Sequence, residues 1–514
     1  MKSLFKTVAL ITFFSFLTRV AGFLFRIVLS RIVGAEGLGV YQVASSIFIV
    51  LLTVISSGIP LIISRTSANF LVKKEKGEGS FVNVSLVFTL IISIILSIIV
   101  IIFKDAFALL FTNKEYVYIL IAFLPGLVFS SIYCVLRGVM WGKSNYFALC
   151  ITEFYEQIVR ILLALLMIDI TFSAFKNALN LALSMSIACV FSMILTILLY
   201  FYYGGKIGKI KRGYLKPLVK QSLPITFMRV ASSFIQPVVA IIIPLRLIGL
   251  GFTNSQALSL YGVAVGMTMP LLFVPTMIIG SLSTALIPDI STALAQNDKN
   301  HIEKRIDSSL FFALFISSLF IPFFLGAGEQ IGQFLYDDIL SGTLLQSSSW
   351  VLLPLGLTNI SSGILNSLGL EKKSFINFVI GSVAMLLSLW FLPSLLGINA
   401  LLWGLGINYL IISVLNLMML RKSAKIKLNI LKPVLKILLI TLPCSALTSF
   451  VSSLAGLVFP LFISLALSGF VSVSSFILLS GVAGLIDIKV LLISVKDKIK
   501  SRMPKLKGRK LRKV

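Results

Sequence analysis

Apolar stretches of about twenty residues, separated by short polar loops, recur along the whole chain. At 1.5 Å per residue, a helix of this length crosses the roughly 30 Å hydrocarbon core of a bilayer. The pattern predicts fourteen membrane-spanning helices. We place them at residues 8–32, 41–66, 81–103, 116–137, 147–169, 177–203, 221–248, 258–287, 307–328, 346–367, 375–396, 398–420, 433–453 and 457–485.

Composition supports the same fold class. Of 514 residues, 58% are hydrophobic and only 12% are charged, and the mean hydropathy is +1.05. A soluble chain carries about twice that share of charge. The sequence therefore predicts an all-α polytopic membrane protein. Because none of the loops is long enough to hold a catalytic module, we expect no enzymatic activity.

The net charge of +27 is concentrated in loops and in the C-terminal tail. Loops after the even-numbered spans are rich in Lys and Arg, whereas loops after the odd-numbered spans are poorer in them. Basic loops mark the cytoplasmic side and attract anionic lipids. This bias predicts a multi-pass protein of the cytoplasmic (inner) cell membrane with both termini in the cytoplasm. Anionic lipids, and not nucleic acid, are the partners that we expect for the basic residues.

An internal repeat relates the two halves of the chain. "TRVAGF" (18–23) is echoed by "MRVASSF" (228–234), and "GVYQVASSIF" (39–48) by "SLYGVAVGM" (259–267). Six spans per half is an even number, so the two halves enter the membrane in the same orientation. We expect an N-terminal six-helix lobe (1–205) and a C-terminal six-helix lobe (206–427). Two extra helices (428–485) and a basic cytoplasmic tail (486–514) follow.

Arginines lie within the predicted spans. Arg19 and Arg26 are seven residues apart, so they share one helical face about 10 Å long. Arg229 is their counterpart in the second half. One Arg at a helix centre costs roughly 2.5–3.5 kcal/mol on translocon scales, so such residues are kept for a partner, for water or for an anionic ligand. We expect these three to line a cationic cavity between the halves. Arg65 is a further candidate, although its side chain can also reach the headgroups from the helix end.

Span five carries two carboxylates. Glu156 and Arg160 are four residues apart, which predicts a local ion pair. For Glu153 we favour a salt bridge to an arginine of the first span over a proton or cation site. The sequence contains no cluster of side chains with metal-ligand spacing, so we expect neither a metal nor a cofactor. The four cysteines are expected to be unpaired.

Three segments carry a family resemblance: "TRVAGFLFRIVLSRIVGAEGLGVYQ" (18–42), "GIPLIISR" (58–65) and "LIPDIS" (286–291). With them the chain resembles the polysaccharide-exporter branch of the multidrug/oligosaccharidyl-lipid/polysaccharide flippase superfamily, which includes the lipid II flippases. The resemblance implies two six-helix lobes in a V, a central cationic cavity, and a lipid-tail groove on the two extra helices. Arg19 matches a cavity arginine of the lipid II flippases, and Arg26 falls one position from the next one.

We therefore expect a flippase that moves an undecaprenyl-diphosphate-linked saccharide across the membrane by alternating access. The cargo is expected to be a peptidoglycan precursor such as lipid II, in sporulation or in vegetative wall synthesis. Sodium, protons or the membrane potential could each drive the cycle. Two alternatives stay open, a cation-coupled drug extruder of the same superfamily and a membrane glycosyltransferase.

Overall fold

The computed structural model describes residues 2–73, 77–280, 290, 299–424 and 430–485, and every regular element in these ranges is helical. The long helices of the first half are α1 (Lys2–Ser56), α2 (Gly58–Lys73), α3 (Glu78–Ile102), α5 (Val117–Gly142), α6 (Tyr146–Met167) and α7 (Ala174–Tyr202), with the short α4 (Lys104–Ala108) after α3. Those of the second half are α8 (Leu215–Ser233), α9 (Ile235–Gly249), α10 (Asn254–Gly262), α11 (Met269–Leu272), α13 (Lys299–Tyr336), α14 (Ile339–Ser348), α15 (Leu352–Ser367), α16 (Glu371–Phe391), α17 (Pro393–Leu396) and α18 (Asn399–Ala424). A π-helical turn, η3 (Val263–Thr268), joins α10 to α11, and α19 (Leu431–Val458) and α20 (Leu461–Val482) complete the bundle.

The predicted all-α polytopic fold is confirmed. Ten helical stretches among the described residues are long and apolar enough to cross a membrane, and a bent pair at 254–280 would make eleven. The first stretch, Leu10–Lys73, covers two predicted spans, because the two arms of α1 meet at Gly34 without a loop and α2 follows directly. Helix α6 is long enough but contains three charged residues. The count of fourteen crossings therefore stays a prediction, and the predicted tail at 486–514 lies outside the described residues.

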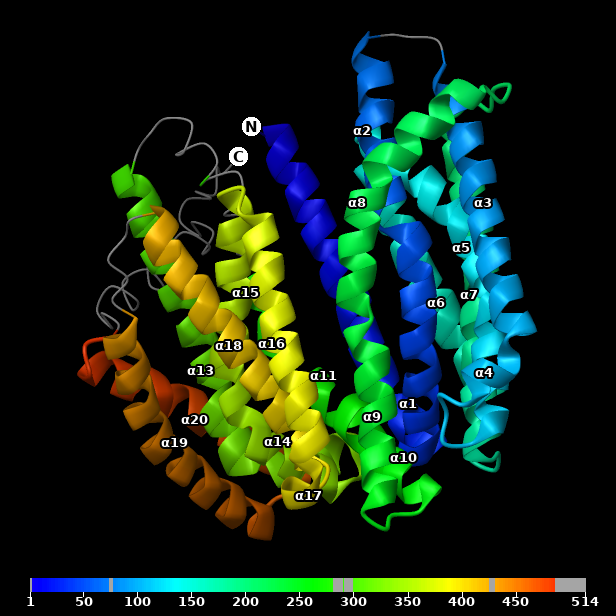
Figure 1. The fold of residues 1–514 in the computed structure, drawn as a ribbon. Helices are drawn as coiled ribbons and strands as arrows, with labels where there is room; N and C mark the ends of the chain where they lie inside the picture. Colours follow the sequence, from blue (N-terminus) through cyan, green and yellow to red (C-terminus); the bar gives the residue numbers. More distant parts are fainter. Residues whose placement is uncertain (1, 74–76, 281–289, 291–298, 425–429, 486–514) are drawn as a thin grey trace, which may run out of the picture.

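Helix α1 consists of two arms that meet at Gly34. This residue has φ 73° and ψ 173°, in the region of positive φ that a side chain disfavours and glycine adopts readily. The first arm runs from the upper to the lower end of the molecule in Figure 1, and the second arm returns. One helical stretch therefore supplies two neighbouring crossings, and the break lies at the lower end.

The two halves meet at this lower end through a close crossing of the second arm of α1 with α10. A β-carbon added at Gly262 would overlap the carbonyl oxygen of Ala35, and one added at Gly39 would overlap that of Leu258. Ala35 precedes Gly39 by four residues, just as Leu258 precedes Gly262, so the contact is two-fold symmetric. Small residues let helix backbones approach this closely in membranes. The stretches that form the crossing belong to the internal repeat that the sequence indicates.

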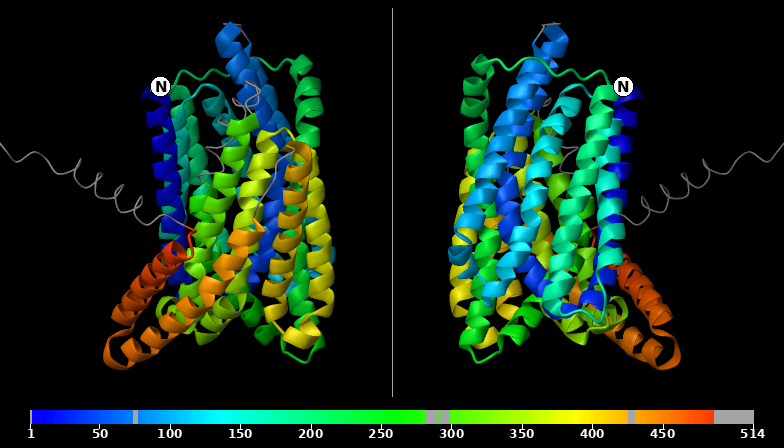
Figure 2. Two further views of the ribbon diagram at one scale, coloured as in Figure 1. Left: turned by 90° about the vertical axis from the view of Figure 1, so that its left-hand side faces the viewer. Right: turned by 90° about the vertical axis from the view of Figure 1, so that its right-hand side faces the viewer.

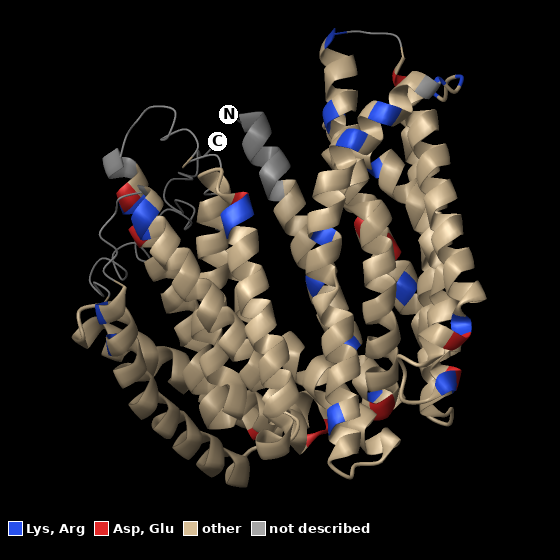
Figure 3. Cartoon of the chain, viewed as in Figure 1, with Lys and Arg blue, Asp and Glu red and all other residues tan. Residues whose placement is uncertain are grey.

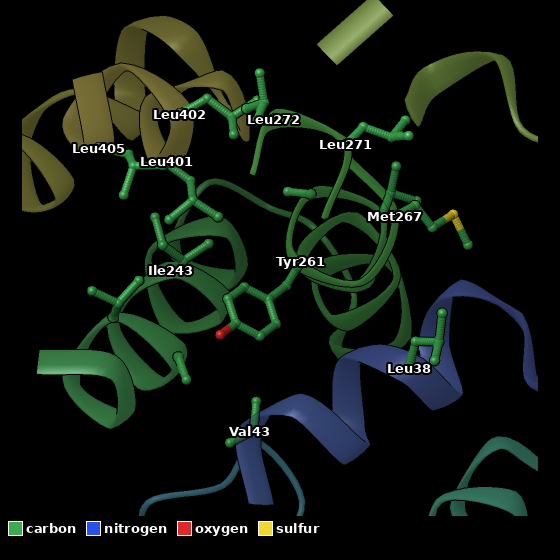
Figure 4. Close-up of a cluster of buried hydrophobic side chains, with 14 of the residues drawn as sticks. Leu38, Val43, Ile243, Tyr261, Met267, Leu271, Leu272, Leu401, Leu402 and Leu405 are labelled. Atoms are coloured by element: carbon green, nitrogen blue, oxygen red, sulfur yellow. The ribbon is translucent and has the colours of Figure 1, made fainter. Parts of the chain in front are cut away.

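A shared hydrophobic core surrounds this crossing. Leu38 and Val43 of α1 lie with Ile243 of α9, Tyr261 of α10 and Leu401 of α18 in one cluster of buried side chains (Figure 4). A separate buried cluster lies within the first half, around Ile63, Val82 and Val139. Within the described residues, the core that joins the halves is thus built at the lower end.

Helix α8 packs on the first half. Leu218 belongs to the buried cluster of Ile63 and Val82, and a β-carbon at Gly58 of α2 would overlap the carbonyl oxygen of Ser222. The chain therefore changes halves close to α9, which packs against both α1 and α16. The predicted lobe boundary at 205/206 remains a proposal, because α8 follows this boundary in the sequence but packs on the first half.

The last two helices pack on the outside of the second half. Helices α19 and α20 lie against α13 and against each other (Figures 1 and 2). Gln330 of α13 ties them together, because its Nε2 donates to the carbonyl of Ser452 at 2.8 Å and its Oε1 accepts from Ser464 Oγ at 3.2 Å. Leu457 and Phe470, on the other faces of the pair, are exposed. The two extra helices are thus an addition to the second half.

We predict that Gly262→Ala destabilises the protein, because the new methyl group has no space unless α1 and α10 move apart. Overpacking of this kind costs about 1–3 kcal/mol. Thermal unfolding in detergent should therefore show a midpoint several degrees lower. The matched control is Gly249→Ala, because a β-carbon there meets no atom within 4 Å. Equal midpoints for the two variants would contradict the close crossing.

Candidate functional site

Arg19 and Arg26 lie on the first arm of α1, on one face as predicted. The arm packs along α6, where the ring of Phe14 contacts those of Phe147 and Phe154 with centroids 6.3 and 5.9 Å apart. One turn before Arg26, a β-carbon at Gly22 would lie 3.3 Å from Gln157 Nε2. Both arginines therefore lie beside α6, on the edge of the first half.

Arg19, Arg65 and Arg229 are exposed, and none forms a hydrogen bond or an ion pair with a described residue. All three lie in helices that are long and apolar enough to cross a membrane. A guanidinium group in hydrocarbon without a partner is unfavourable by several kcal/mol. These side chains therefore need water, a headgroup or a ligand.

Arg65 and Arg229 lie on either side of the contact between α2 and α8. Arg65 follows Gly58 by seven residues, and Arg229 follows Ser222 by seven, so each shares the face of its helix that makes this contact. Because the two helices run antiparallel, each arginine lies about 10 Å from the contact, in opposite directions. The structure therefore does not bring Arg65 and Arg229 together.

Arg26 has a different environment. It is half-buried, and it forms no hydrogen bond or ion pair with a described residue. Arg31, on the same arm, donates to the carbonyl oxygens of Leu335 at 3.1 Å and Phe334 at 2.5 Å in α13. The lower part of this arm thus touches the second half.

The partner that we expected for Glu153 is wrong. Glu153 does not pair with an arginine of the first span, because Arg137 of α5 donates to its Oε2 at 2.6 Å. Arg137 also donates to the hydroxyl of Tyr133 at 3.2 Å and lies over its ring. Glu153 does form a salt bridge, as expected, but its partner is Arg137 of the neighbouring helix α5.

The expected ion pair between Glu156 and Arg160 is not formed as a direct contact. Glu156 Oε2 accepts from Ser192 Oγ of α7 at 3.2 Å, whereas Arg160 donates to Gln157 Oε1. Glu156 is therefore a carboxylate held by a serine of α7 inside the first half.

Sequence reasoning did not single out Arg137, the last residue of the predicted span 116–137. In the structure it lies inside α5, five residues before the helix ends at Gly142. The available signal was its spacing of four from Tyr133, which places the two side chains on one helical face. In the described residues no group of His, Cys, Asp or Glu has the geometry to hold a metal ion.

The basic side chains gather at one end of the bundle. In Figure 3, Lys and Arg are most dense at the upper end, around the end of α2 and the start of α8. Lys143, after α5, pairs there with Glu78 at 2.9 Å. The loops that the sequence predicts to be cytoplasmic therefore share one end, opposite to the crossing of α1 and α10.

A bundle of long apolar helices, with arginines that have no partner among the described residues, defines a polytopic membrane protein. The family model described as "Polysaccharide biosynthesis protein" matches residues 4–294, and the chain belongs to this family. Stage V sporulation protein B of Bacillus subtilis is 27% identical over 382 residues, which are 71% of this chain and 73% of that protein. Sporulation protein YkvU of the same organism is 22% identical over 319 residues, 60% of this chain and 70% of its own length.

Solved structures share the fold. The lipid II flippase MurJ, in an inward closed conformation, aligns with a TM-score of 0.69 at 15% identity over 92% of this chain and 98% of its own. An inward-facing multidrug-resistance transporter of the MATE family aligns with a TM-score of 0.64 at 16% identity, over 79% and 94%. One of these two neighbours is a lipid II flippase, and the other is a multidrug-resistance transporter.

We predict that cysteines introduced at Arg19 and Arg229 react with an impermeant, charged thiol reagent, because an exposed guanidinium group without a protein partner is expected to face water and not acyl chains. The matched controls are Leu24→Cys on α1 and Phe227→Cys on α8, which are 55% and 72% exposed but lie on other faces of the same helices. The background lacks the four natural cysteines, which are free in the structure. We expect at least a tenfold faster reaction at the arginine positions. Similar slow rates at all four would place the arginines in lipid.

Proposed function

We propose that this protein is a flippase that moves an undecaprenyl-diphosphate-linked saccharide across the cytoplasmic membrane by alternating access. The observation that carries the proposal is the set of unpaired guanidinium groups, Arg19, Arg26 and Arg229, in otherwise apolar helices. A diphosphate with a polar saccharide would face a barrier on the order of tens of kcal/mol in bare hydrocarbon. Arg supplies a permanent charge and a planar fork of donors that matches phosphate oxygens.

The relatives support the lipid-linked cargo. The family description names polysaccharide biosynthesis, and the solved neighbour with a TM-score of 0.69 is a lipid II flippase. Together with the sporulation relatives, they favour a peptidoglycan precursor as the saccharide. The prenyl tail would stay in lipid along the exposed apolar faces of α19 and α20, where Leu457 and Phe470 lie.

The arrangement of the halves favours a state that is closed at the lower end. The crossing of Gly39 with Gly262 and the bonds from Arg31 to α13 lie at that end. If the basic upper end is cytoplasmic, by the preference of basic loops for that side, the site is loaded from the cytoplasm in this state. Anionic lipids would bind the basic loops there.

We predict that Arg19→Ala lowers translocation of a labelled lipid-linked precursor at least tenfold, because one charge-assisted contact to the diphosphate is lost. Arg19→Lys should keep part of the activity, since it keeps the charge but loses the fork. The assay measures how much precursor becomes accessible in the opposite leaflet of proteoliposomes. Lys104→Ala, which removes an exposed cation from α4, is the control and should move precursor normally. Unchanged translocation by Arg19→Ala would refute the role of this residue.

A cation-coupled drug extruder is the second candidate, favoured by the MATE neighbour with a TM-score of 0.64. Such a transporter would bind cations through carboxylates, and Glu156 is a carboxylate without a direct ion pair inside the first half. Drug-resistance profiles of a strain that lacks the gene separate the two functions. Sensitivity to cationic drugs without accumulation of a lipid-linked precursor would favour the extruder.

A further inference from the structure

The segment of residues 204–220, which joins α7 to α8, carries only positive charge. Its sequence, "GGKIGKIKRGYLKPLVK", contains five lysines and one arginine but no Asp or Glu. We call residues 204–211, which cross the upper end of the first half (Figure 2), the connecting loop. The lysines of this loop are exposed, and its two isoleucines, Ile207 and Ile210, are 55% and 57% exposed. Basic and apolar side chains therefore follow one another along an exposed loop.

The connecting loop is held on the first half, although it forms no helix or strand. Asn83 Nδ2 of α3 donates to the carbonyl oxygen of Gly208 at 2.8 Å. The hydroxyl of Tyr200, in α7, donates to the carbonyl oxygen of Lys206 at 2.8 Å. A β-carbon added at Gly208 would lie 2.7 Å from the backbone nitrogen of Ser80, so the loop lies against the start of α3. These contacts use the backbone of the loop and leave its Lys and Ile side chains exposed.

The length of α7 places the connecting loop at the depth of the lipid headgroups. Helix α7 has 29 residues, so at 1.5 Å per residue it is about 43 Å long, which matches a bilayer with its headgroup layers. Its exposed side chains include Phe191, Ile194 and Leu198, and the helix ends at Tyr202, which is 82% exposed. Tyrosine is enriched at the boundary between membrane and water. The connecting loop follows directly and therefore lies where lipid phosphates lie.

The two kinds of side chain in the loop suit different parts of one ligand. Lysines attract a negatively charged headgroup, and each Lys near an anionic bilayer surface strengthens binding about fivefold. Isoleucines that are exposed at this depth gain from contact with the acyl chains below the headgroups. An apolar surface beside basic residues is how segments at the membrane surface bind anionic lipid. The chemistry therefore fits a phospholipid with a net negative charge.

We propose that the connecting loop is a docking surface for anionic phospholipids of the leaflet at the upper end. The loop contains no carboxylate that would compete for its lysines, and Glu78, at the start of α3, is already paired with Lys143 at 2.9 Å. The proposal narrows to one loop the expectation, stated with the proposed function, that anionic lipids bind the basic loops. It does not depend on the nature of the cargo, because lipid bound here stays in its leaflet.

Two exposed lysines beyond the lower end of α3 lack this pattern and supply a matched control. Lys104 is followed by Asp105, and Lys114 by Glu115, and all four side chains are exposed. A neighbouring carboxylate offsets the attraction of a lysine for an anionic headgroup. Two lysines can therefore be neutralised at either end of the molecule, with the same change in total charge but a different expected effect on lipid binding.

We predict that Lys209→Gln combined with Lys211→Gln lowers the affinity for phosphatidylglycerol about tenfold or more, because two attractive charges are lost. The measurement is a lipid titration of the full-length protein in detergent, read by native mass spectrometry of the protein–lipid complexes. The control, Lys104→Gln combined with Lys114→Gln, should bind phosphatidylglycerol as the wild type does. Phosphatidylcholine, which has no net charge, should bind all three proteins equally. Equal affinities for phosphatidylglycerol in the two double variants would overturn the proposal.

A second loop variant, Ile207→Ser combined with Ile210→Ser, tests the apolar part of the surface. It keeps every charge, so its affinity for phosphatidylglycerol and for phosphatidylcholine should fall together, about threefold or more. Both loop variants should keep the melting temperature of the wild type in lipid-free detergent, because the altered side chains are exposed. A lower melting temperature with an unchanged preference for phosphatidylglycerol over phosphatidylcholine would show a structural role and overturn the docking surface.

These results are separable from those on the proposed function. In phosphatidylcholine proteoliposomes, Lys209→Gln combined with Lys211→Gln should translocate the labelled precursor as the wild type does. If this variant stops translocation there, the loop acts on the cargo and the docking proposal fails. If the wild type moves no precursor but prefers phosphatidylglycerol through the loop lysines, the docking surface stands and the flippase proposal fails. If translocation depends on Arg19 while the loop variants bind phosphatidylglycerol normally, the reverse holds.

Discussion

A guanidinium group inside a bilayer must have a partner, water or a ligand, and this constraint divides the arginines of the protein into two sets. Arg31 and Arg137 have partners, namely the carbonyls of α13 and the carboxylate of Glu153. Arg19, Arg26 and Arg229 have none among the described residues. The first set holds helices together, and the second set is free to bind an anion that comes from outside the chain.

The free arginines would be of little use if the halves were fixed together along their whole length. The glycine crossing of α1 with α10 lies at one end of the molecule, and the basic side chains gather at the other. A close contact between small residues can separate without moving large side chains. This arrangement suits a bundle whose halves rock about a site between them, with Arg31 bonded to α13 near the closed end.

The sequence predicted those features of the structure that depend on a single helix. Hydropathy located the helices, and a spacing of seven placed Arg19 and Arg26 on one face. It did not predict the partner of Glu153, because Arg137 comes from another helix and stood near a predicted loop. Gln157 was not singled out either, because one amide in a span has no charge that demands a partner. Its unpaired Nε2 becomes visible only when α1 is packed against α6.

The most direct test is an electron cryomicroscopy structure of the protein in lipid nanodiscs with a bound undecaprenyl-diphosphate saccharide. The account predicts that the diphosphate lies between the halves, within hydrogen-bond distance of the Arg19 or Arg26 guanidinium group, with the prenyl chain in lipid. A structure in which Arg19 and Arg229 point into acyl chains, and the diphosphate binds elsewhere, would contradict it.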